Sequence, residues 1–207
     1  MADRGRVGSL SRRMAESVTP SDHDLLQGLR AGDEEAFTLL YRRWQGPLYR
    51  YALRVSGSPA LAEDVTQEVF MALLRRNEGY DPSRGELSSY LHGIARNIAR
   101  RRLGRERGLQ RLADEEAGPD DPLADLARRE RSDLVWEGLL GLPLHYREAV
   151  VLCDLQGMSY EEAAATLGCA VGTVRSRLHR GREQLGTRLR SARPVPVAAQ
   201  PAPRMTR

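Results

Sequence analysis

Residues 159–185 read "SYEEAAATLGCAVGTVRSRLHRGREQL". Apolar side chains recur at helical spacing on both sides of a glycine at position 168. The first segment predicts a short helix over 159–167, in which the small side chains of Ala163 and Ala164 let another helix approach closely. Gly168 predicts a tight turn, and Thr173 is expected to cap a longer basic helix over 173–189. Two helices joined in this way form a helix-turn-helix.

The second helix of this pair separates into two faces when it is drawn on a helical wheel. Val174, Leu178, Gly181 and Leu185 share one narrow arc, which predicts the seam that packs on the core. The remaining surface carries side chains that contact base edges and phosphates in protein–DNA complexes. Base contacts are expected from Arg175, Ser176, His179 and Arg180, and phosphate contacts from Arg177 and Arg182, with Thr173 at the helix start. The alternative is a solvated basic helix at the end of a bundle.

The composition favours an all-α protein. Aromatic residues make up only 5% of the chain, so strands, which favour aromatic and β-branched residues, are poorly supported. The abundant Leu, Ala, Arg and Glu favour helices instead. The net charge is +4 and every basic residue is arginine, whose planar guanidinium suits phosphate and carboxylate partners.

Several classes of protein are disfavoured by the sequence. Cys153 and Cys169 are the only cysteines, which is too few for a zinc site or a secreted disulfide framework. No stretch is long and apolar enough to span a bilayer, and residues 1–20 lack a signal peptide, so a cytoplasmic protein is expected. No catalytic triad, paired acids or phosphate loop appears, so we expect no enzyme activity, cofactor, metal or small-molecule substrate. His23, His92 and His145 are isolated and are expected to be structural.

The chain divides into two small helical domains. Residues 1–20 and the proline-rich residues 191–207 are expected to be disordered tails. Residues 21–105 predict one domain and residues 131–190 a second, joined by an acidic, flexible linker over residues 106–130. In the second domain, helices are expected over 131–140, 143–155, 159–167 and 173–189.

Capping residues and prolines place the helix boundaries of the first domain. Ser21 or Asp22 is expected to cap a first helix and Asp33 a second. Pro47 is expected to kink or divide that second helix, because it lacks a backbone N–H. Pro59 is expected at the first position of a third helix.

The segment "AEDVTQEVFMALLRR" (residues 62–76) predicts a helix with two kinds of surface. Its core face is expected to carry Leu61, Val65, Val69, Ala72 and Leu73. A second, mixed acidic and apolar face carries Asp64, Gln67, Glu68, Met71 and Leu74. Such a mixed outward face is typical of a protein-binding surface. Ordinary packing against a neighbouring helix explains it equally well.

The segment "YDPSRGELSSYLHGIARNIARRRLGR" (residues 80–105) predicts a loop over its first part and then a helix that ends in an arginine run. A cationic helix beside a loop with aromatic rings suits single-stranded nucleic acid, whose bases stack on such rings. The candidate residues are Tyr80, Tyr90, Arg96, Asn97, Arg100 and Arg101. A solvated charged face with core tyrosines is the alternative.

Four stretches in this order resemble a bacterial RNA polymerase sigma factor of the sigma-70 family, extracytoplasmic-function (ECF) group. They are "LLQGLRAGDEEAFTLLYRRW", "AEDVTQEVF", "YDPSRGELSSYLHGIARN" and "LPLHYREAVVLCDLQGMSYEEAAATLGCAVGTVRSRLHRGREQL". The resemblance covers about residues 22–105 and 132–188. It departs from the usual pattern at Tyr90, where the family usually carries Trp, at Leu87, where it carries an aromatic residue, and at His179, where some members do.

The resemblance implies a function for each surface. Asp64, Gln67, Glu68 and Met71 match the segment that docks on core RNA polymerase. The loop and helix with Tyr80, Tyr90 and Asn97 match the part that reads and opens the −10 element, and the helix-turn-helix matches the part that binds the −35 element. The family also implies an anti-sigma factor as a partner, by which the protein could be held at the membrane without inserting into it.

Two other classes of function remain open. A free-standing helix-turn-helix regulator would explain residues 131–190 but would leave residues 22–105 without a purpose. An interaction module with an incidental basic surface would explain the acidic and apolar face alone. Only the sigma factor requires binding to core RNA polymerase.

Overall fold

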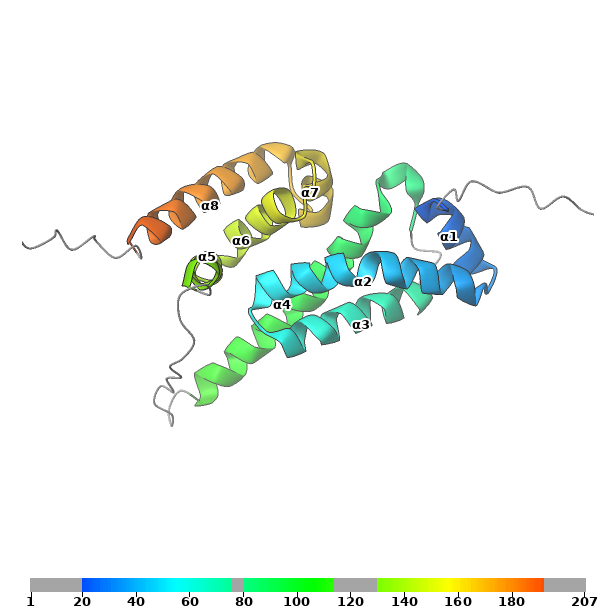
Figure 1. The fold of residues 1–207 in the computed structure, drawn as a ribbon, viewed down its shortest axis with the longest axis horizontal. Coiled ribbons are helices and arrows are strands. Elements are labelled where there is room, and N and C mark those ends of the chain that lie inside the picture. Colours follow the sequence, from blue (N-terminus) through cyan, green and yellow to red (C-terminus); the bar gives the residue numbers. More distant parts are fainter. Residues whose placement is uncertain (1–19, 76–79, 114–129, 192–207) are drawn as a thin grey trace, which may run out of the picture.

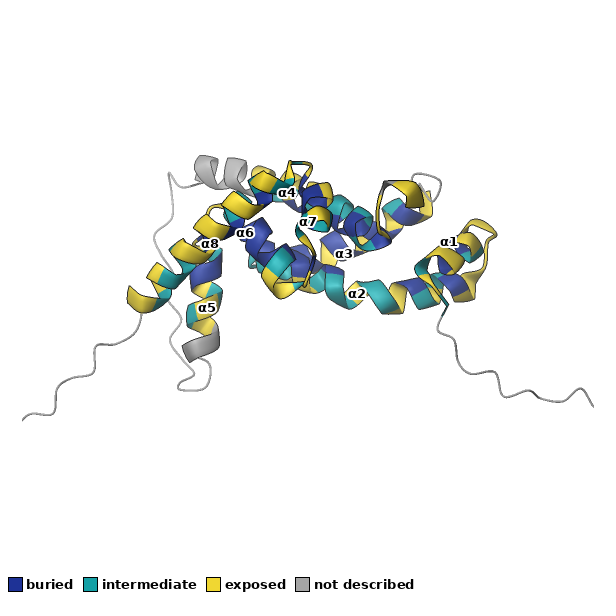
Figure 2. Cartoon of the chain, turned by 90° about the horizontal axis from the view of Figure 1, so that it is seen from above, coloured by how far each residue is buried: buried dark blue, intermediate teal, exposed yellow. Residues whose placement is uncertain are grey.

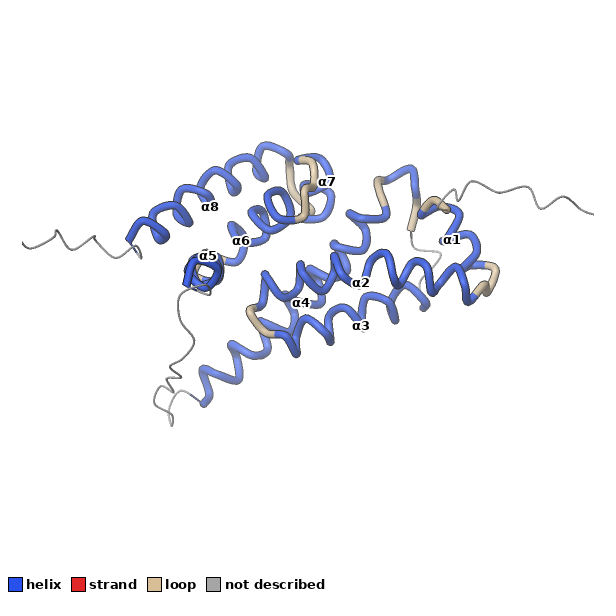
Figure 3. The backbone as a smooth tube through the Cα atoms, viewed as in Figure 1, coloured by secondary structure: helices blue, strands red, loops and turns tan. Residues whose placement is uncertain are grey.

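The computed structural model describes residues 20–75, 80–113 and 130–191, and every regular element in these ranges is helical (Figure 3). The predicted all-α class is confirmed for this part of the chain. Within it, no helix combines the length and apolar character needed to cross a lipid bilayer. The elements are α1 (Asp22–Arg30), α2 (Glu34–Ser56), α3 (Pro59–Arg75), the 3-10 turn η2 (Pro82–Arg84), α4 (Leu87–Ala113), α5 (Glu130–Leu140), α6 (Leu144–Val150), the π-helical turn η3 (Val151–Leu155), α7 (Tyr160–Leu167) and α8 (Val171–Ser191).

Helix α1 begins where the sequence predicts. Ser21 is its N-cap: the Ser21 hydroxyl accepts the Asp24 N–H at 3.2 Å, and the Asp24 carboxylate accepts the Ser21 N–H at 3.1 Å. This reciprocal capping box satisfies two backbone donors that the helix leaves unpaired. Asp33 caps α2 in a similar way, accepting the Glu35 N–H at 2.8 Å.

Pro47 does not divide α2, which runs unbroken from Glu34 to Ser56. A proline inside a helix removes one backbone hydrogen bond, but packing on the core can offset that cost. Leu48 and Tyr51, directly after the proline, are both 0% exposed. The Pro47 carbonyl also accepts a hydrogen bond at 3.0 Å from the Gln156 side chain of the second domain.

The core of the first domain lies between α2, α3 and α4, which pack on one another (Figure 1). On α3 the predicted inward residues Leu61, Val65, Val69 and Leu73 are buried, whereas Ala72 is only partly so. Pro59 occupies the first position of α3, as predicted. Helix α4 begins at Leu87, after the predicted loop. It continues to Ala113, beyond residue 105, where the first domain was expected to end.

The second domain consists of α5 to α8. Ser159 and Glu162 form a capping box that starts α7, and Gly168 ends it in the left-handed conformation with φ 61°. The helix expected over 143–155 begins at Leu144, with Pro143 just before it, and widens into the π turn η3 over its last five residues. The helix-turn-helix formed by α7 and α8 agrees with the prediction.

The two domains pack against each other, with α7 against α4 and with α5 and α6 against α2 (Figure 1). The Thr166 hydroxyl donates to the Ser89 carbonyl at 3.3 Å, and the Ser89 hydroxyl approaches the Glu162 carbonyl at 3.4 Å. Ser89 and Thr166 are both buried. The sequence predicted two domains but not this contact between them.

Parts of the predicted organisation lie outside the described residues. These are residues 1–19 and 192–207 of the two tails and residues 114–129 of the linker. Ser191, assigned to the C-terminal tail, is instead the last residue of α8.

Candidate nucleic-acid and protein interfaces

Helix α8 has the two faces that its sequence predicts. Val174, Leu178 and Gly181 are buried, and Leu185 is partly buried. Figure 2 shows exposed residues along most of the length of the helix. The outward residues Arg175, Ser176, His179, Arg180 and Arg182 are all exposed, whereas Thr173 and Arg177 are half-buried.

Thr173 does not cap α8, because the helix already begins at Val171. The N–H groups of Thr173 and Val174 instead donate to the Ala170 carbonyl at 2.9 and 3.2 Å. Thr173 therefore lies in the first turn. Its carbonyl accepts the Ser176 hydroxyl at 3.0 Å, which orients a residue expected to read bases.

Neighbouring side chains hold the arginines of α8 in different ways. Arg182 pairs with Asp154 of η3, with Nη2–Oδ1 and Nε–Oδ2 distances of 2.5 and 3.0 Å. These hydrogen bonds raise the pKa of Arg182. The Arg175 guanidinium lies 5.7 Å from the centroid of the Tyr160 ring, which limits its movement without neutralising it. Arg175 thus keeps its full charge for another partner, whereas Arg182 shares its charge with an acid.

The mixed face of α3 includes large apolar side chains in contact with solvent. Met71 is 41% and Leu74 44% exposed, and Gln67, one turn before Met71, is exposed as well. These three residues line one wall of a groove of ≈ 680 Å³ between α2 and α3. Tyr41, which is 39% exposed, lines the other wall. Such a contiguous exposed apolar surface is typical of a protein-binding site.

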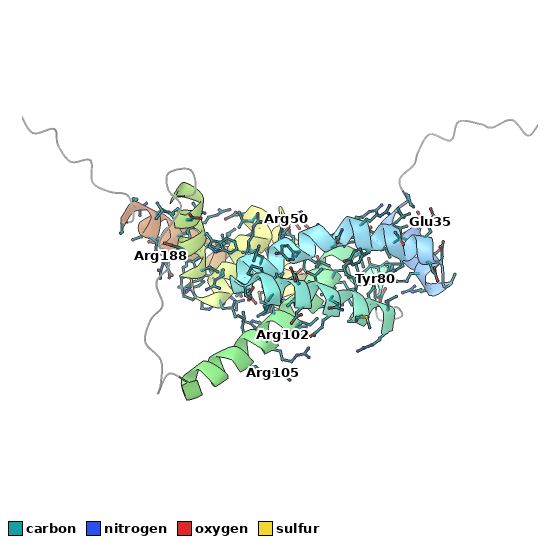
Figure 4. All side chains as sticks on the ribbon, turned by 60° about the horizontal axis from the view of Figure 1, so that its bottom comes forward. Glu35, Arg50, Tyr80, Arg102, Arg105 and Arg188 are labelled. Atoms are coloured by element: carbon teal, nitrogen blue, oxygen red, sulfur yellow. The ribbon has the colours of Figure 1, made fainter. Side chains whose placement is uncertain are left out.

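The two acids of this face are paired inside the domain. Arg102 of α4, which Figure 4 labels, contacts Asp64 at 2.5 Å and also binds Glu68 through two nitrogens. Arg101 reaches the other oxygen of Glu68 at 3.1 Å. Packing on a neighbouring helix therefore accounts for Asp64 and Glu68, while Gln67 and Met71 face outward. Arg101, expected at a nucleic-acid surface, lies beside residues expected at a protein surface.

The loop before α4 holds two tyrosine rings together. The Tyr80 and Tyr90 centroids are 5.4 Å apart, and the Tyr80 hydroxyl donates to the Gly85 carbonyl at 3.0 Å. Both rings line a hollow of ≈ 300 Å³ to whose wall Ala165 of α7 also contributes, from the second domain. Asn97 is exposed and lies with Tyr90 along a second hollow, of ≈ 680 Å³, between α3 and α4.

Comparison with known families shows the family to which the chain belongs. Residues 40–108 match the family described as Sigma-70 region 2, and residues 132–185 match the family described as Sigma-70, region 4. The chain belongs to the sigma-70 family. The first match contains the α3 face and the Tyr80 loop of this sigma factor, and the second contains its helix-turn-helix.

Individual relatives place this sigma factor in the ECF group. It is 43% identical over 182 residues to the ECF RNA polymerase sigma factor SigE of Mycolicibacterium smegmatis, covering 81% of this chain and 69% of that protein. It is 33% identical to the ECF RNA polymerase sigma-E factor of Haemophilus influenzae, covering 85% and 98%. Among solved structures it resembles the sigma factor RpoE of Bartonella quintana in complex with the anti-sigma factor NepR, with TM-score 0.62, 27% identity, and coverage of 76% and 98%.

Two arginines expected at the −10 surface point into the interface between the domains. The Nε atoms of Arg96 and Arg100 lie 3.2 and 3.0 Å from one oxygen of Glu148 in α6. The Arg96 side chain is only 12% exposed. Glu148 was not among the predicted residues, because nothing in its local sequence shows that it meets α4.

Arg147 is a second residue that the sequence did not single out. It is 8% exposed, and its guanidinium donates to the carbonyls of Val55, Leu140 and Leu142. The Val55 and Leu140 carbonyls belong to the last turns of α2 and α5, and Leu142 follows α5 directly. Helix C-termini leave acceptors unpaired and favour a cation. A buried guanidinium thus joins the ends of two helices from different domains. In the sequence Arg147 stands between Tyr146 and Glu148, which gives it no distinctive signal.

The cysteines and the buried histidine have structural surroundings. Cys153 and Cys169 are free and half-buried. Burial, with the nearby Asp154 carboxylate, raises the pKa of Cys153 and disfavours the reactive thiolate. His92 is buried between Trp44 and Tyr51, and its Nδ1–H donates to the Ser88 carbonyl at 2.8 Å.

Proposed function

We propose that this sigma factor binds core RNA polymerase and directs promoter-specific initiation of transcription. The observation behind this proposal is that one chain combines two surfaces. The helix-turn-helix of region 4 exposes Arg175, Ser176, His179 and Arg180, and the region 2 domain has an exposed groove beside α3. The first surface suits the major groove of the −35 element. The second suits a protein partner. The related proteins are named RNA polymerase sigma factors.

The individual residues take the following roles in this proposal. Gln67 and Met71 contact the polymerase directly, while Asp64 and Glu68 contribute through their pairs with Arg101 and Arg102. For the −10 element, Tyr80 and Tyr90 hold a base, and Asn97 offers its amide to a base edge. Arg96, Arg100 and Arg101 guide the strand. On the −35 side, Thr173 and Arg177 support the outward base-reading residues from the edge of α8.

The protein acts as an initiation factor in the cytoplasm rather than as an enzyme. The Bartonella quintana relative was solved with an anti-sigma factor. An anti-sigma factor is accordingly the regulatory partner that we propose for this chain as well.

A free-standing regulator is the competing function, and a reconstitution experiment separates the two. The full chain is mixed with purified core RNA polymerase and a library of randomised promoters. We expect transcripts that share upstream −35 and −10 sequences and that appear only when the chain is present. Binding of the chain to duplex DNA without binding to core polymerase, and without transcripts, would instead support the free-standing regulator.

Gln67→Ala combined with Met71→Ala is expected to weaken binding to core polymerase by about 2 kcal/mol, on the order of thirtyfold, from one lost polar contact and one lost apolar contact. These two residues are chosen because neither belongs to the ion pairs with Arg102. Affinity is measured by fluorescence titration of labelled full chain with polymerase. Glu35→Ala, exposed at the start of α2, is the control and should bind normally. An unchanged affinity in the double variant would refute the assignment of this surface.

Arg175 and Arg182 are expected to differ in how their loss affects DNA binding. Arg175→Ala should cost about 1–3 kcal/mol on the best −35 site and relax the preference at one base position. Arg182→Ala should weaken all sites alike and reduce the salt dependence by about one unit of slope. Binding of the polymerase complex to wild-type and single-base-altered sites is measured across a salt series.

The Arg182 variant also leaves the Asp154 carboxylate unpaired. The double variant Asp154→Asn/Arg182→Ala removes this carboxylate charge as well. Comparison of the double variant with Arg182→Ala therefore separates the loss of the phosphate contact from repulsion between Asp154 and DNA. If Arg175→Ala weakens every site equally, α8 holds DNA without reading it at that position.

A further inference from the structure

Glu148 is a buried carboxylate at the interface between the two domains. It belongs to α6 of the second domain and is 0% exposed. Its charge is matched by two arginines of α4 in the first domain, Arg96 at 3.2 Å and Arg100 at 3.0 Å. The interface thus places one negative charge of region 4 against two positive charges of region 2.

The contact of Glu148 with Arg96 and Arg100 is a charge interaction rather than a set of well-aligned hydrogen bonds. Among the described residues, neither Glu148 oxygen has a hydrogen-bond partner with good geometry, and the same holds for Arg96 Nε and the Tyr51 hydroxyl. Charge attraction across a buried interface is strong, but the cost of removing the Glu148 and Arg96 charges from water offsets much of it, and the Arg100 side chain is 41% exposed. A closed arrangement held in this way is only modestly favoured, so binding of a partner to either domain can open it.

The same contact borders part of the proposed −10 surface. Ala165 of α7 lies at the rim of the hollow lined by Tyr80 and Tyr90, and the Thr166 hydroxyl donates to the Ser89 carbonyl beside it. The Arg96 side chain is only 12% exposed, so a strand cannot reach its guanidinium without displacing α6. Asn97 and Arg101 stay exposed in this arrangement.

Promoter geometry requires the closed arrangement to open. The nominal −10 and −35 positions are ~25 base pairs apart, which is ~85 Å of duplex at ~3.4 Å per base pair. In the closed arrangement α7 packs on α4, and α8 follows α7 after a short turn. The two DNA surfaces are then separated by roughly the width of one helix, ~10 Å, plus the length of α8, ~30 Å. The chain between Ala113 and Glu130 can span ~50 Å when extended, so opening requires neither domain to unfold.

We propose that Glu148 is an electrostatic latch that holds region 4 closed on region 2 in the chain alone. It masks Arg96 from nucleic acid and occupies Arg100, whose side chain stays 41% exposed. This inference rests on the proposed function, because it takes the masked surface to be the −10 surface. The latch carboxylate occupies the arginines that a strand phosphate would otherwise bind. Core polymerase and promoter DNA, which engage the two domains far apart, release it.

The first test measures closure without DNA. Glu86→Cys and Ala165→Cys place thiols on opposite domains around one hollow, in a Cys153→Ala/Cys169→Ala background. A short bismaleimide should join them efficiently in the full chain. Adding Glu148→Gln should reduce the yield at least about tenfold, because Arg96 and Arg100 then face each other without a counter-charge. The control Glu161→Gln removes an exposed negative charge from α7 and should leave the yield unchanged.

The second test measures masking with a fluorescein-labelled oligo(dT) strand. Glu148→Gln should bind it about tenfold more tightly than the unaltered chain, since the competent open fraction rises. The gain should vanish when Arg96→Gln and Arg100→Gln are also present, because it depends on those two side chains. The cross-linked Glu86→Cys/Ala165→Cys protein should bind the strand at least about tenfold more weakly than the same protein before cross-linking. This comparison needs no substitution at Glu148, so it holds even if Glu148→Gln does not fold.

Each outcome bears on the latch. Full cross-linking in Glu148→Gln would overturn it, as would equal oligo(dT) binding by cross-linked and free protein. A gain in oligo(dT) affinity that persists without Arg96 and Arg100 would also overturn it. A failed transcription assay would defeat the proposed function separately, because neither latch measurement uses polymerase or a promoter.

Discussion

An Arg147→Met variant is expected to lose about 3 kcal/mol of unfolding free energy, because two buried charge-assisted hydrogen bonds within the second domain are worth about 1.5 kcal/mol each. The Leu142 carbonyl would remain buried and the Leu140 carbonyl partly buried after losing this donor. The bond to the Val55 carbonyl, at 2.6 Å, joins the two domains, so its loss should also weaken their packing. Methionine retains much of the side-chain volume, so the effect reports the lost guanidinium rather than a cavity.

Guanidinium denaturation of the full chain followed by far-UV circular dichroism measures this loss. Arg50→Met is the matched control, since Arg50 is exposed on α2 and its replacement should change stability by less than about 0.5 kcal/mol. A loss below about 1 kcal/mol in Arg147→Met would mean that the carbonyls at the ends of α2 and α5 find other donors.

A Gly181→Leu variant is expected to destabilise the second domain by about 3 kcal/mol or more and to abolish −35 binding, because the packed core has no room for added atoms. A Cβ at position 181 would lie 2.8 Å from a methyl group of Val150 and 3.3 Å from the Tyr146 carbonyl. Helix α8 would have to move away from α6, and its outward residues would no longer be aligned with the groove of DNA.

Gly186→Leu, five residues further along the same helix, should have the opposite sign. A Cβ there meets only the end of the Arg190 side chain, at 3.4 Å. Leucine also favours the helix over glycine by roughly 0.8 kcal/mol, so this variant should be as stable as the parent or slightly more stable. Thermal unfolding of both variants provides the comparison. Equal effects at the two positions would show that helix propensity, rather than contact with α6, governs position 181.

Much of the candidate site could be predicted because it depends on local periodicity. The spacing of Val174, Leu178 and Gly181 predicted the buried seam of α8, and the structure confirms it. The same reasoning placed Gln67 and Met71 on an exposed face of α3. A helical wheel succeeds in these cases because one side of a surface helix packs on its own domain. Roles toward polymerase and promoter remain proposals for all of these residues.

Pairings between distant segments could not be predicted in this way. For Asp64 and Glu68 the sequence left open a protein-binding face or packing on a neighbouring helix, and the structure pairs them with Arg101 and Arg102, more than thirty positions away. Arg96 and Arg100 were expected to face a strand, yet they meet Glu148 across the domain interface. The wheel shows which way a side chain leaves its own helix but not which other helix lies opposite.

The sequence by itself determined the helices, most of their caps, the helix-turn-helix and the two faces of α3 and α8, because all of these follow from residues within one or two turns of each other. Only the tertiary structure decided that α2 continues through Pro47, that Arg147 joins the ends of α2 and α5, and that Glu148 holds the arginines of α4. Those outcomes depend on packing and on charges brought together from separate segments. The energies of these contacts depend on how deeply the groups are buried and how far apart they lie, and both are defined only once the chain has folded.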